Sequence, residues 1–253
     1  MMTPRFYCPM PLAANARMAL PENAARHAGR VLRLRVGDDL VLFDGAGGEY
    51  AARIAEINRE QVTVDVLQWR DAECEAPIKV TLVQALQSGE KMDMTMQKAV
   101  ELGVARIIPV ASRRSVVRLD GERALRRLLH WRAVVLSACE QCGRNRVPEV
   151  AALAGLDCWL GQAAGKGVLR LMLAPGATQT LDSIAPPAPG GALELLIGAE
   201  GGLAPEEIEM ATQAGYVPLR LGPRILRTET AGLAALAAIQ CLWGDFRERA
   251  DHV

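Results

Sequence analysis

The chain has 253 residues, enough for one large domain or two modest ones, and half of them are hydrophobic, which supports a full core. Its 29 basic and 29 acidic residues give a formal net charge of zero, which taken alone argues against a nucleic-acid partner. No apolar run reaches the roughly 20 residues of a membrane span, and no signal peptide is recognised. We therefore expect a cytoplasmic protein without membrane contact.

Although the net charge is zero, the arginines are concentrated in two segments of the chain. Between Arg17 and Arg35 lie five arginines and a single acid, and between Val104 and Arg146 lie ten arginines and three acids. The planar guanidinium group matches the geometry of phosphate better than a point charge does. Both segments are therefore candidates for RNA contact, although solvated helix faces with scattered arginines are the alternative.

Six cysteines are scattered along the chain, and Cys139 and Cys142 have CxxC spacing. A zinc site needs two more ligands, and the sequence offers neither a second cysteine pair nor an HxxxH motif. The pair also falls within a helical pattern. We therefore expect free thiols and no metal.

Residues 1–72 have the pattern of short strands. Apolar residues alternate or cluster from Val31 to Leu67, and Pro21–His27 is typical of a short helix. This pattern predicts a small antiparallel β-barrel, followed by a polar, acidic linker at Arg70–Pro77. The turn-rich breaks within the barrel are Gly37–Asp39, Asp44–Gly48 and Asn58–Glu60.

After the linker, strands alternate with helices. This alternation predicts an α/β domain with a largely parallel sheet over residues 77–253. The predicted strands are Lys79–Leu86, Ala105–Val110, Val168–Leu173, Leu193–Ile197 and Val217–Leu221. The predicted helices are Gly89–Leu102 and Gly121–Cys142, with two more that begin at Pro205 and at about Thr228.

Two glycine-containing loops, in Leu195–Ile208 and Leu219–Gly232, each join a buried strand to a helix. Neither has the GxGxxG or GxxxxGK[ST] pattern of nucleotide-binding loops. Glu200, Glu206 and Glu207 also crowd the first loop, whereas a phosphate favours bare amides and positive potential. The loops therefore favour a ligand without phosphates, and ordinary strand-to-helix turns are the alternative.

The same loops, LLIGAEGGLAPEEIEMA and LRLGPRILRTETAGLAAL, resemble the two signature loops of the RsmE family. The resemblance extends to QSGEKMDMTMQKAVELGVARIIPV, ACEQCGRNRVPEV and HAGRVLRLRVGDDLVLFDG, so it covers most of the chain with motifs in the expected order. Members of this family are S-adenosylmethionine-dependent methyltransferases of the trefoil-knotted SPOUT class. They methylate the N3 atom of uridine 1498 in the 16S rRNA of the small ribosomal subunit.

The resemblance implies a PUA-like, OB-type RNA-binding barrel in residues 1–72 and a SPOUT methyltransferase domain in residues 77–253. It also implies a homodimer. Knots are so rare in proteins that only the resemblance predicts one here. S-adenosylmethionine carries a sulfonium cation and no phosphate, which agrees with the acidic first loop.

The resemblance further implies that strand ends and loop backbone hold the cofactor. Glu200 would face the sulfonium or orient a loop, and Thr230 would contact the cofactor or cap its helix. The expected cofactor-binding residues are Leu173, Ala174, Pro175, Ile197, Gly198, Glu200, Gly201, Gly202, Leu221, Gly222, Ile225, Leu226, Thr230 and Ala231.

The chemistry requires that the weakly acidic N3 proton leaves as the nitrogen attacks, so a base or a positive charge would help. Arg144 is the first choice for that charge, with Arg227 as a further cation and Glu140 as a base. For each arginine, a surface ion pair is the alternative. The expected RNA-binding residues are Arg26, Arg30, Arg33, Arg113, Arg146 and Arg224.

Three other functions remain open from the sequence. A knotted methyltransferase acting on tRNA or large-subunit rRNA would share the same motifs. A ribosome-assembly factor that binds RNA without catalysis is the non-enzymatic alternative. A phosphate-binding α/β enzyme is least favoured, because its glycine motifs are missing.

Overall fold

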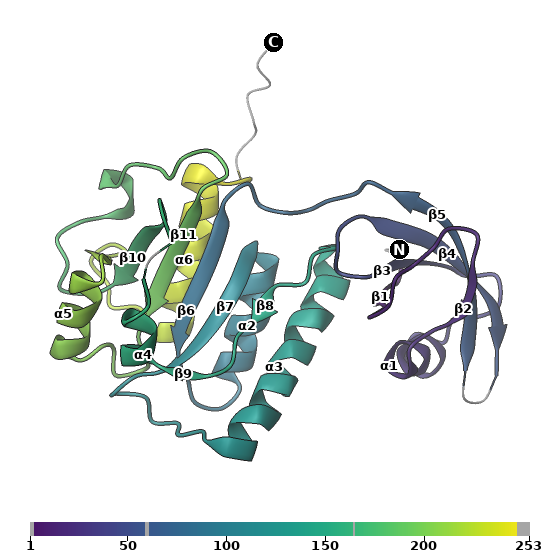
Figure 1. Cartoon of the computed structure of the whole chain (residues 1–253), viewed down its shortest axis with the longest axis horizontal. Helices are drawn as coiled ribbons and strands as arrows, with labels where there is room; N and C mark the ends of the chain where they lie inside the picture. Colours follow the sequence, from purple (N-terminus) through teal and green to yellow (C-terminus); the bar gives the residue numbers. More distant parts are fainter. Residues whose placement is uncertain (1–2, 59–60, 164, 247–253) are drawn as a thin grey trace, which may run out of the picture. The chain divides into compact units, whose positions relative to one another are not determined.

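The computed structural model describes residues 3–58, 61–163 and 165–246. The chain divides into two compact units (Figure 1): unit 1 is Met1–Glu75 with Leu136–Val147, and unit 2 is Ala76–Val135 with Pro148–Val253. The long helix α3 (Gly121–Cys142) contributes residues to both units. No helix or strand occurs at residues 71–78, where the linker was expected. The domain boundaries at residues 72 and 77 stay a prediction.

Unit 1 is built on a five-stranded sheet in the order β1-β3-β4-β5-β2. Its strands are β1 (Arg5–Tyr7), β2 (Arg17–Ala19), β3 (Asp39–Phe43), β4 (Glu49–Ile57) and β5 (Val62–Arg70). The β3–β4, β4–β5 and β2–β5 pairs are antiparallel, but β1 runs parallel to β3. The prediction of a wholly antiparallel barrel is therefore wrong at β1. The intervening chain, which includes a helix, is long enough for a parallel crossover.

The predicted helix at Pro21–His27 is present and extends further than expected. Pro21 precedes helix α1 (Glu22–Arg26), and its fixed φ suits this boundary. The chain continues as a wider π-type turn, η1 (His27–Val31). Ala25 and Ala28 face a core that includes Phe6 and Ile54. Small alanine side chains therefore let this segment lie directly on the sheet.

Unit 2 contains a seven-stranded sheet in the order β12-β10-β11-β6-β7-β8, with β9 also paired to β7. Every pairing between these strands is parallel, which confirms the predicted parallel-sheet α/β domain. This is the arrangement expected for the SPOUT class. Strand order alone does not define a knot, so the knot stays a prediction. The strands are β6 (Lys79–Ala85), β7 (Val104–Ala111), β8 (Glu149–Val150), β9 (Ala154–Gly155), β10 (Leu169–Leu173), β11 (Ala192–Ile197) and β12 (Val217–Leu219).

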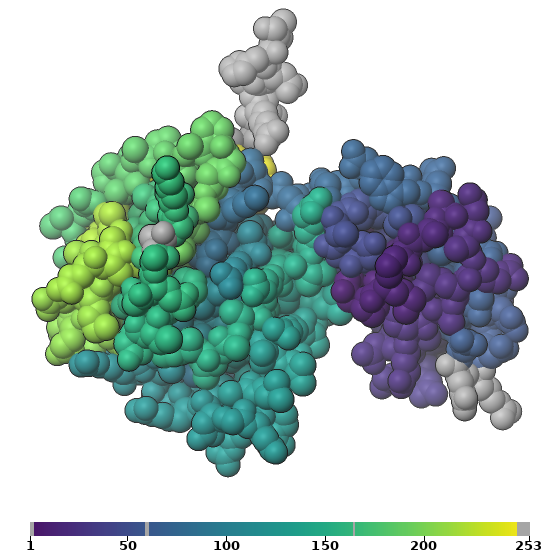
Figure 2. Space-filling view, in the orientation of Figure 1, coloured from purple at the N-terminus to yellow at the C-terminus, as the bar shows by residue number. Residues whose placement is uncertain are grey.

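Helices cover the sheet of unit 2 (Figure 1). α2 (Lys91–Glu101) and α6 (Thr228–Trp243) pack against each other and against β7 and β11, respectively. α4 (Leu156–Leu160) and α5 (Pro205–Gln213) also contact each other, and their side chains join a second buried cluster with the sheet. The outer side of α5 lies on the molecular surface, yellow-green in Figure 2. A short 3-10 turn, η2 (Leu181–Ser183), completes the elements.

The neighbouring strands β12, β10 and β11 end at the same edge of the sheet. Parallel strands present their carboxyl ends together, and ligands of open α/β sheets bind in the crevice beyond such ends. β12 stops at Leu219, two residues earlier than predicted, and the next residues belong to the loop. The fold therefore brings together the loops that follow Leu173, Ile197 and Leu219. No helix in the described ranges is long and apolar enough to cross a bilayer.

The cysteines give a direct test of this packing. Cys8 and Cys139 are fully buried free thiols, and burial raises the pKa of each to about 12. Since the thiolate is the reactive form, we expect neither to react with a thiol reagent at pH 7.5 until the chain is unfolded. The exposed thiols, which should react first, are Cys74, Cys158 and Cys241. Mass spectrometry of timed alkylation would measure this order. Equal labelling of Cys139 and Cys74 in the native protein would contradict it.

Candidate functional site

A pocket of about 270 Å³ lies at the carboxyl ends of β10, β11 and β12 in unit 2, beside the start of α6. Its walls come from Leu173–Pro175, Ile197–Gly202 and the Leu219–Leu226 loop, with Thr228 and Ala231 from the helix. Thirteen of the fourteen residues expected to hold a cofactor line it. Thr230 does not. The residues expected from the sequence therefore meet at one pocket, and their role in cofactor binding stays a prediction.

The first glycine loop is folded tightly on itself. The Gly202 N–H donates to the Ala199 carbonyl at 2.8 Å, and Gly202 has a φ of +72°, in the left-handed region that favours glycine. A Cβ on Gly198 would lie 2.8 Å from the Leu203 nitrogen. Glycine is therefore required here by close approach of backbone to backbone.

Arg114 fixes the other side of this loop. Its Cβ lies 3.1 Å from the position that a Cβ on Gly201 would take, and its Nη1 donates to the Gly201 carbonyl at 2.9 Å. The neighbouring Arg113 N–H donates to Glu207 Oε1 at 2.7 Å, and the other oxygen of Glu207 accepts the Ala204 N–H at 2.8 Å. Glu207 thus ties the start of α5 to the loop after β7.

Thr228, at the start of α6, holds the first glycine loop in place. Its hydroxyl is buried and donates to the Gly198 carbonyl at 2.5 Å. The same oxygen accepts from the side-chain amides of Gln84 and Gln87, each at 3.3 Å. Thr95 in α2 in turn donates to Gln87 Oε1 at 2.8 Å. This buried network links β6, α2, the glycine loop and α6.

Thr230, which was expected to contact the cofactor or cap the helix, does not line the pocket and does not cap α6. α6 begins at Thr228, its N-cap residue is Arg227, and no side chain caps it. Thr230 is exposed, because two positions along a helix turn a side chain to a different face. Thr228 lines the pocket instead, and its hydroxyl bonds the first glycine loop.

We expect Thr228→Val to lower the free energy of unfolding by about 1–2 kcal/mol, because it leaves buried amide groups without their hydroxyl partner. We also expect it to weaken binding in the pocket by about tenfold, since the Gly198 carbonyl loses its anchor. Thr230→Val removes the same atom from an exposed site and should cost under 0.5 kcal/mol, as surface changes usually do. Urea unfolding and ligand titration of both variants would measure this. An equal effect of the two changes would contradict the assignment.

Glu200 is the acidic residue of the pocket wall. Its Oε1 accepts both the backbone N–H of Ser88, at 2.9 Å, and the Ser88 hydroxyl, at 2.7 Å. Partial burial opposes ionisation, but the hydrogen bonds from Ser88 and the charge of Lys91 outweigh it and lower the pKa of Glu200. The pocket therefore carries a fixed negative charge at neutral pH.

Lys91 lies between two carboxylates. Its Nζ is 3.8 Å from Glu200 Oε1 and 3.7 Å from Glu229 Oε1. Glu229 Oε2 is buried and has no hydrogen-bond partner within the described ranges. Neither Ser88 nor Lys91 was predicted from the sequence to belong to the site. The signal was present, because both lie in the QSGEK segment that carries the family resemblance.

Three arginines lie at or beside the pocket. Arg220 and Arg224 line it, and Arg227 precedes α6, where its carbonyl accepts the Ala231 N–H at 2.7 Å. All three are exposed, and none has a side-chain partner in the part of the chain that is described. The guanidinium groups of Arg227 and Arg224 therefore face solvent, and their roles toward a substrate stay a prediction.

Arg144 and Glu140 belong to unit 1 and have structural partners there. Arg144 is 3% exposed, and its Nε and Nη2 donate to the two oxygens of Glu75 at 3.0 and 2.6 Å. Glu140 accepts the Tyr7 N–H at 3.1 Å, and burial raises its pKa. These contacts favour a structural role for both residues. No local sequence pattern indicates these contacts, since Glu75 and Tyr7 lie far from Arg144 and Glu140 along the chain.

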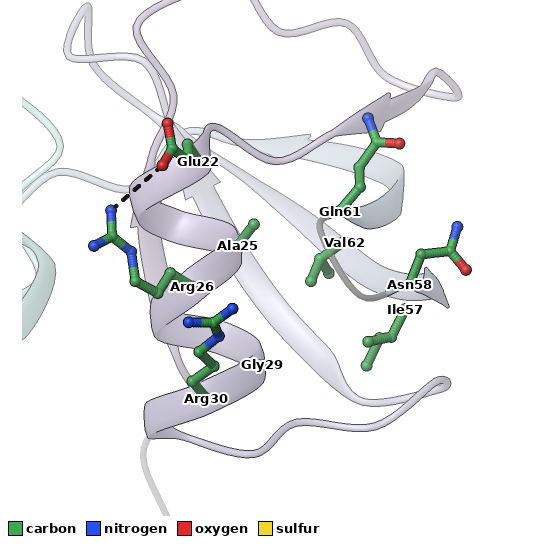
Figure 3. Close-up of a pocket in the computed structure, with 9 residues that line it drawn as sticks. All are labelled: Glu22, Ala25, Arg26, Gly29, Arg30, Ile57, Asn58, Gln61 and Val62. Atoms are coloured by element: carbon green, nitrogen blue, oxygen red, sulfur yellow. Dashed lines mark ion pairs between the residues drawn. The ribbon is translucent and has the colours of Figure 1, made fainter.

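The six arginines expected to bind RNA are all exposed. Arg26 and Arg30 line a groove of about 550 Å³ in unit 1. Figure 3 shows both on α1 and η1, with Asn58 and Gln61 on the opposite wall and an ion pair between Arg26 and Glu22. This groove is larger than the pocket of unit 2. Most of its lining residues, however, are polar. Size alone therefore does not identify the cofactor site.

The remaining expected RNA contacts lie outside that groove. Arg33 has a φ of +54° and projects into solvent, and Arg113 pairs with Glu206 at 3.2 Å. Arg146 pairs with Glu73, also at 3.2 Å. Exposed pairs of this kind are weak, so a phosphate would displace the carboxylates at little cost.

The residues of the unit 2 pocket fit the expected cofactor. Backbone groups of two glycine loops and apolar side chains such as Ile197 and Leu226 form walls suited to a flat base and ribose. The ionised Glu200 suits a cation, and the first loop offers no arrangement typical of phosphate binding. The pocket is therefore chemically suited to S-adenosylmethionine.

Comparisons with known proteins agree with this geometry. The family model of an RNA methyltransferase domain matches residues 74–240, and that of an RNA methyltransferase PUA domain matches residues 20–67. The chain is 34% identical over 242 residues to ribosomal RNA small subunit methyltransferase E of Buchnera aphidicola subsp. Schizaphis graminum, covering 96% of this chain and 97% of the relative. It is also 34% identical over 218 residues to the Bacillus subtilis protein of that name, covering 84% and 85%.

Two solved structures are similar over nearly the whole chain. Ribosomal RNA small subunit methyltransferase E from Neisseria gonorrhoeae, bound to S-adenosyl methionine, has a TM-score of 0.92 and 43% identity, covering 97% of this chain and 100% of that one. A methyltransferase from Legionella pneumophila with the same cofactor bound has a TM-score of 0.92 and 38% identity, with the same coverage.

Proposed function

The chain belongs to the ribosomal RNA small subunit methyltransferase E family, and from this premise we propose that it transfers a methyl group from S-adenosylmethionine to N3 of uridine 1498 in 16S rRNA. One observation carries the proposal for this chain. The two glycine loops and the end of β10 meet in one pocket whose wall contains an ionised carboxylate.

The residues of the chain hold the donor. When bound, S-adenosylmethionine supplies an activated methyl group on a sulfonium cation. Gly198 and Gly202 let backbone groups approach a ligand closely, and Thr228 keeps that backbone in place. Glu200 provides the negative charge that a sulfonium favours.

The acceptor nitrogen must lose its proton as it attacks the methyl carbon. Positive charge near the uracil would stabilise the developing anion. Arg224 and Arg227, exposed at or beside the pocket, are the residues that we assign to this role. Glu229, whose Oε2 has no hydrogen-bond partner within the described ranges, is the carboxylate that we assign to accepting this proton.

The proposal includes RNA contact through surface arginines and the PUA domain, and a homodimer in the cytoplasm. The arginines are those of the sequence analysis, all of them exposed. Single-stranded or unpaired nucleotides are the form of RNA that proteins read by sequence, so the target base would be splayed from its stack. Light scattering of the purified chain would test the dimer, with twice the 27.2 kDa chain mass as the expected result.

The decisive experiment is methyl transfer from labelled S-adenosylmethionine to small ribosomal subunits that lack the modification. Digestion of the RNA and identification of its nucleosides should give labelled 3-methyluridine from one site. Subunits that already carry the modification are the matched control and should accept no label. Labelled 3-methyluridine in tRNA or large-subunit RNA instead would favour the alternative substrates. Absence of both label and cofactor binding would favour the non-catalytic assembly factor.

A further inference from the structure

Ser88 and Glu200 are far apart in the sequence, yet they form one of the closest polar contacts of the pocket wall. Ser88 follows β6, and Glu200 lies in the glycine loop after β11. Both donors of Ser88, the amide and the hydroxyl, converge on the same oxygen of Glu200. Two donors on one carboxylate oxygen fix the side chain and favour its charged form.

The other oxygen of Glu200 has no side-chain partner in the described part of the chain. The Glu200 side chain is 25% exposed and lines the pocket. Ser88 therefore bonds one oxygen, and the Glu200 backbone N–H also bonds the carboxylate, so no other side chain in the described chain competes with a ligand for the second oxygen. The carboxylate is held in place rather than free to turn into solvent.

The charge of a ligand at this wall changes during the proposed reaction. The carbon–sulfur bond of the donor breaks and its electron pair stays on sulfur, a bond forms between N3 and the methyl carbon, and the N3 proton passes to the carboxylate assigned above, that of Glu229. The sulfonium cation of S-adenosylmethionine thereby becomes the neutral sulfur of S-adenosylhomocysteine. A fixed negative charge at the pocket wall attracts the cationic S-adenosylmethionine more strongly than the neutral sulfur of S-adenosylhomocysteine.

The geometry points to Glu200 as the residue that makes the pocket prefer S-adenosylmethionine over S-adenosylhomocysteine, with Ser88 as the positioning residue that holds its carboxylate. This inference rests on the proposed cofactor and goes beyond it, because it assigns discrimination between donor and product. Its consequence is easier release of the product after each transfer.

The positively charged side chains near Glu200 do not cancel the preference for S-adenosylmethionine. Lys91 lies 3.8 Å from the oxygen that Ser88 occupies, and it shares its charge with Glu229. Arg220 and Arg224 line the pocket from the second glycine loop, but among the described residues neither forms an ion pair with Glu200. Among the carboxylates of the described chain, only that of Glu200 belongs to the pocket lining.

The test is calorimetric titration of the full chain with S-adenosylmethionine and, separately, with S-adenosylhomocysteine. Glu200→Gln keeps the shape of the side chain and an oxygen that accepts from Ser88, but removes the charge. We expect its Kd for S-adenosylmethionine to rise about tenfold and its Kd for S-adenosylhomocysteine to change less than twofold. Ser88→Ala, which keeps the amide donor and loses the hydroxyl, should shift the same ratio about threefold.

Glu209→Gln is the matched control, since Glu209 is an exposed glutamate of α5 outside the pocket, and it should leave both Kd values unchanged. Equal weakening of both ligands by Glu200→Gln would show a structural role and overturn the inference. An unchanged ratio in Glu200→Gln, with wild-type binding intact, would also overturn it. A wild-type chain that binds neither ligand would instead refute the proposed function.

Discussion

Gly198→Ala is expected to abolish cofactor binding, with a loss of affinity of about 100-fold or more. A Cβ at this position would lie 2.8 Å from both the Gly202 carbonyl carbon and the Leu203 nitrogen, which are backbone atoms. A rotamer change cannot relieve such an overlap, so the loop itself must move. Inserting one methyl into a packed site typically costs 1–3 kcal/mol, and here the displaced atoms form the pocket wall.

Gly176→Ala provides a matched control, because it lies directly after the pocket residue Pro175. A Cβ at Gly176 would meet no atom within 4 Å, and its backbone is outside the left-handed region. The change should leave binding intact and stabilise the fold slightly by restricting the unfolded chain. Calorimetry with S-adenosylmethionine, together with thermal unfolding, would compare the two variants. Binding by Gly198→Ala within threefold of wild type would refute the assigned role of the loop.

The elements that the sequence predicted well are the long ones with clear stops. α3 begins at Gly121 and ends at Cys142 as expected, because a 22-residue helical pattern is bounded by glycines at 121 and 143. The short elements β8, β9 and α4 were not predicted. Two to five residues contain too little periodicity to distinguish a strand or helix from a loop, so only their pairing with β7 or packing on α5 defines them.

In the candidate site, too, features with a local sequence signal could be predicted, and features that depend on contacts between distant segments could not. The glycine loops could be located because glycine marks backbone constraints that are visible in the sequence. Which of Thr228 and Thr230 faces the pocket depends on how α6 is rotated about its axis. The sequence pattern does not define that rotation to within one residue. The partner of Arg144 is Glu75, 69 positions away, and no local pattern reveals such a pair. Only the contacts between distant segments therefore show which arginines have structural partners and which are left exposed.

The second large effect is expected from Arg170→Met, which should lower the free energy of unfolding by about 3–5 kcal/mol. Arg170 in β10 lies opposite Glu194 in β11, with 2.8 Å between Nε and Oε2 and side chains only 5% and 12% exposed. Tyr216 also donates to Glu194 at 2.7 Å, and Trp159 donates to Tyr216 at 3.0 Å. Without the guanidinium, a buried carboxylate remains with one hydroxyl partner and no countercharge.

Arg113→Met removes the same charge from an exposed pair and should cost under 1 kcal/mol, since its contact with Glu207 is made by backbone. Adding Glu194→Gln to Arg170→Met should recover part of the loss, because it neutralises the charge left behind. Urea denaturation followed by circular dichroism would measure all three. If Arg170→Met cost no more than Arg113→Met, the buried pair would be irrelevant to stability. If the double change recovered nothing, the loss would come from the packing of the arginine stem rather than from an uncompensated charge.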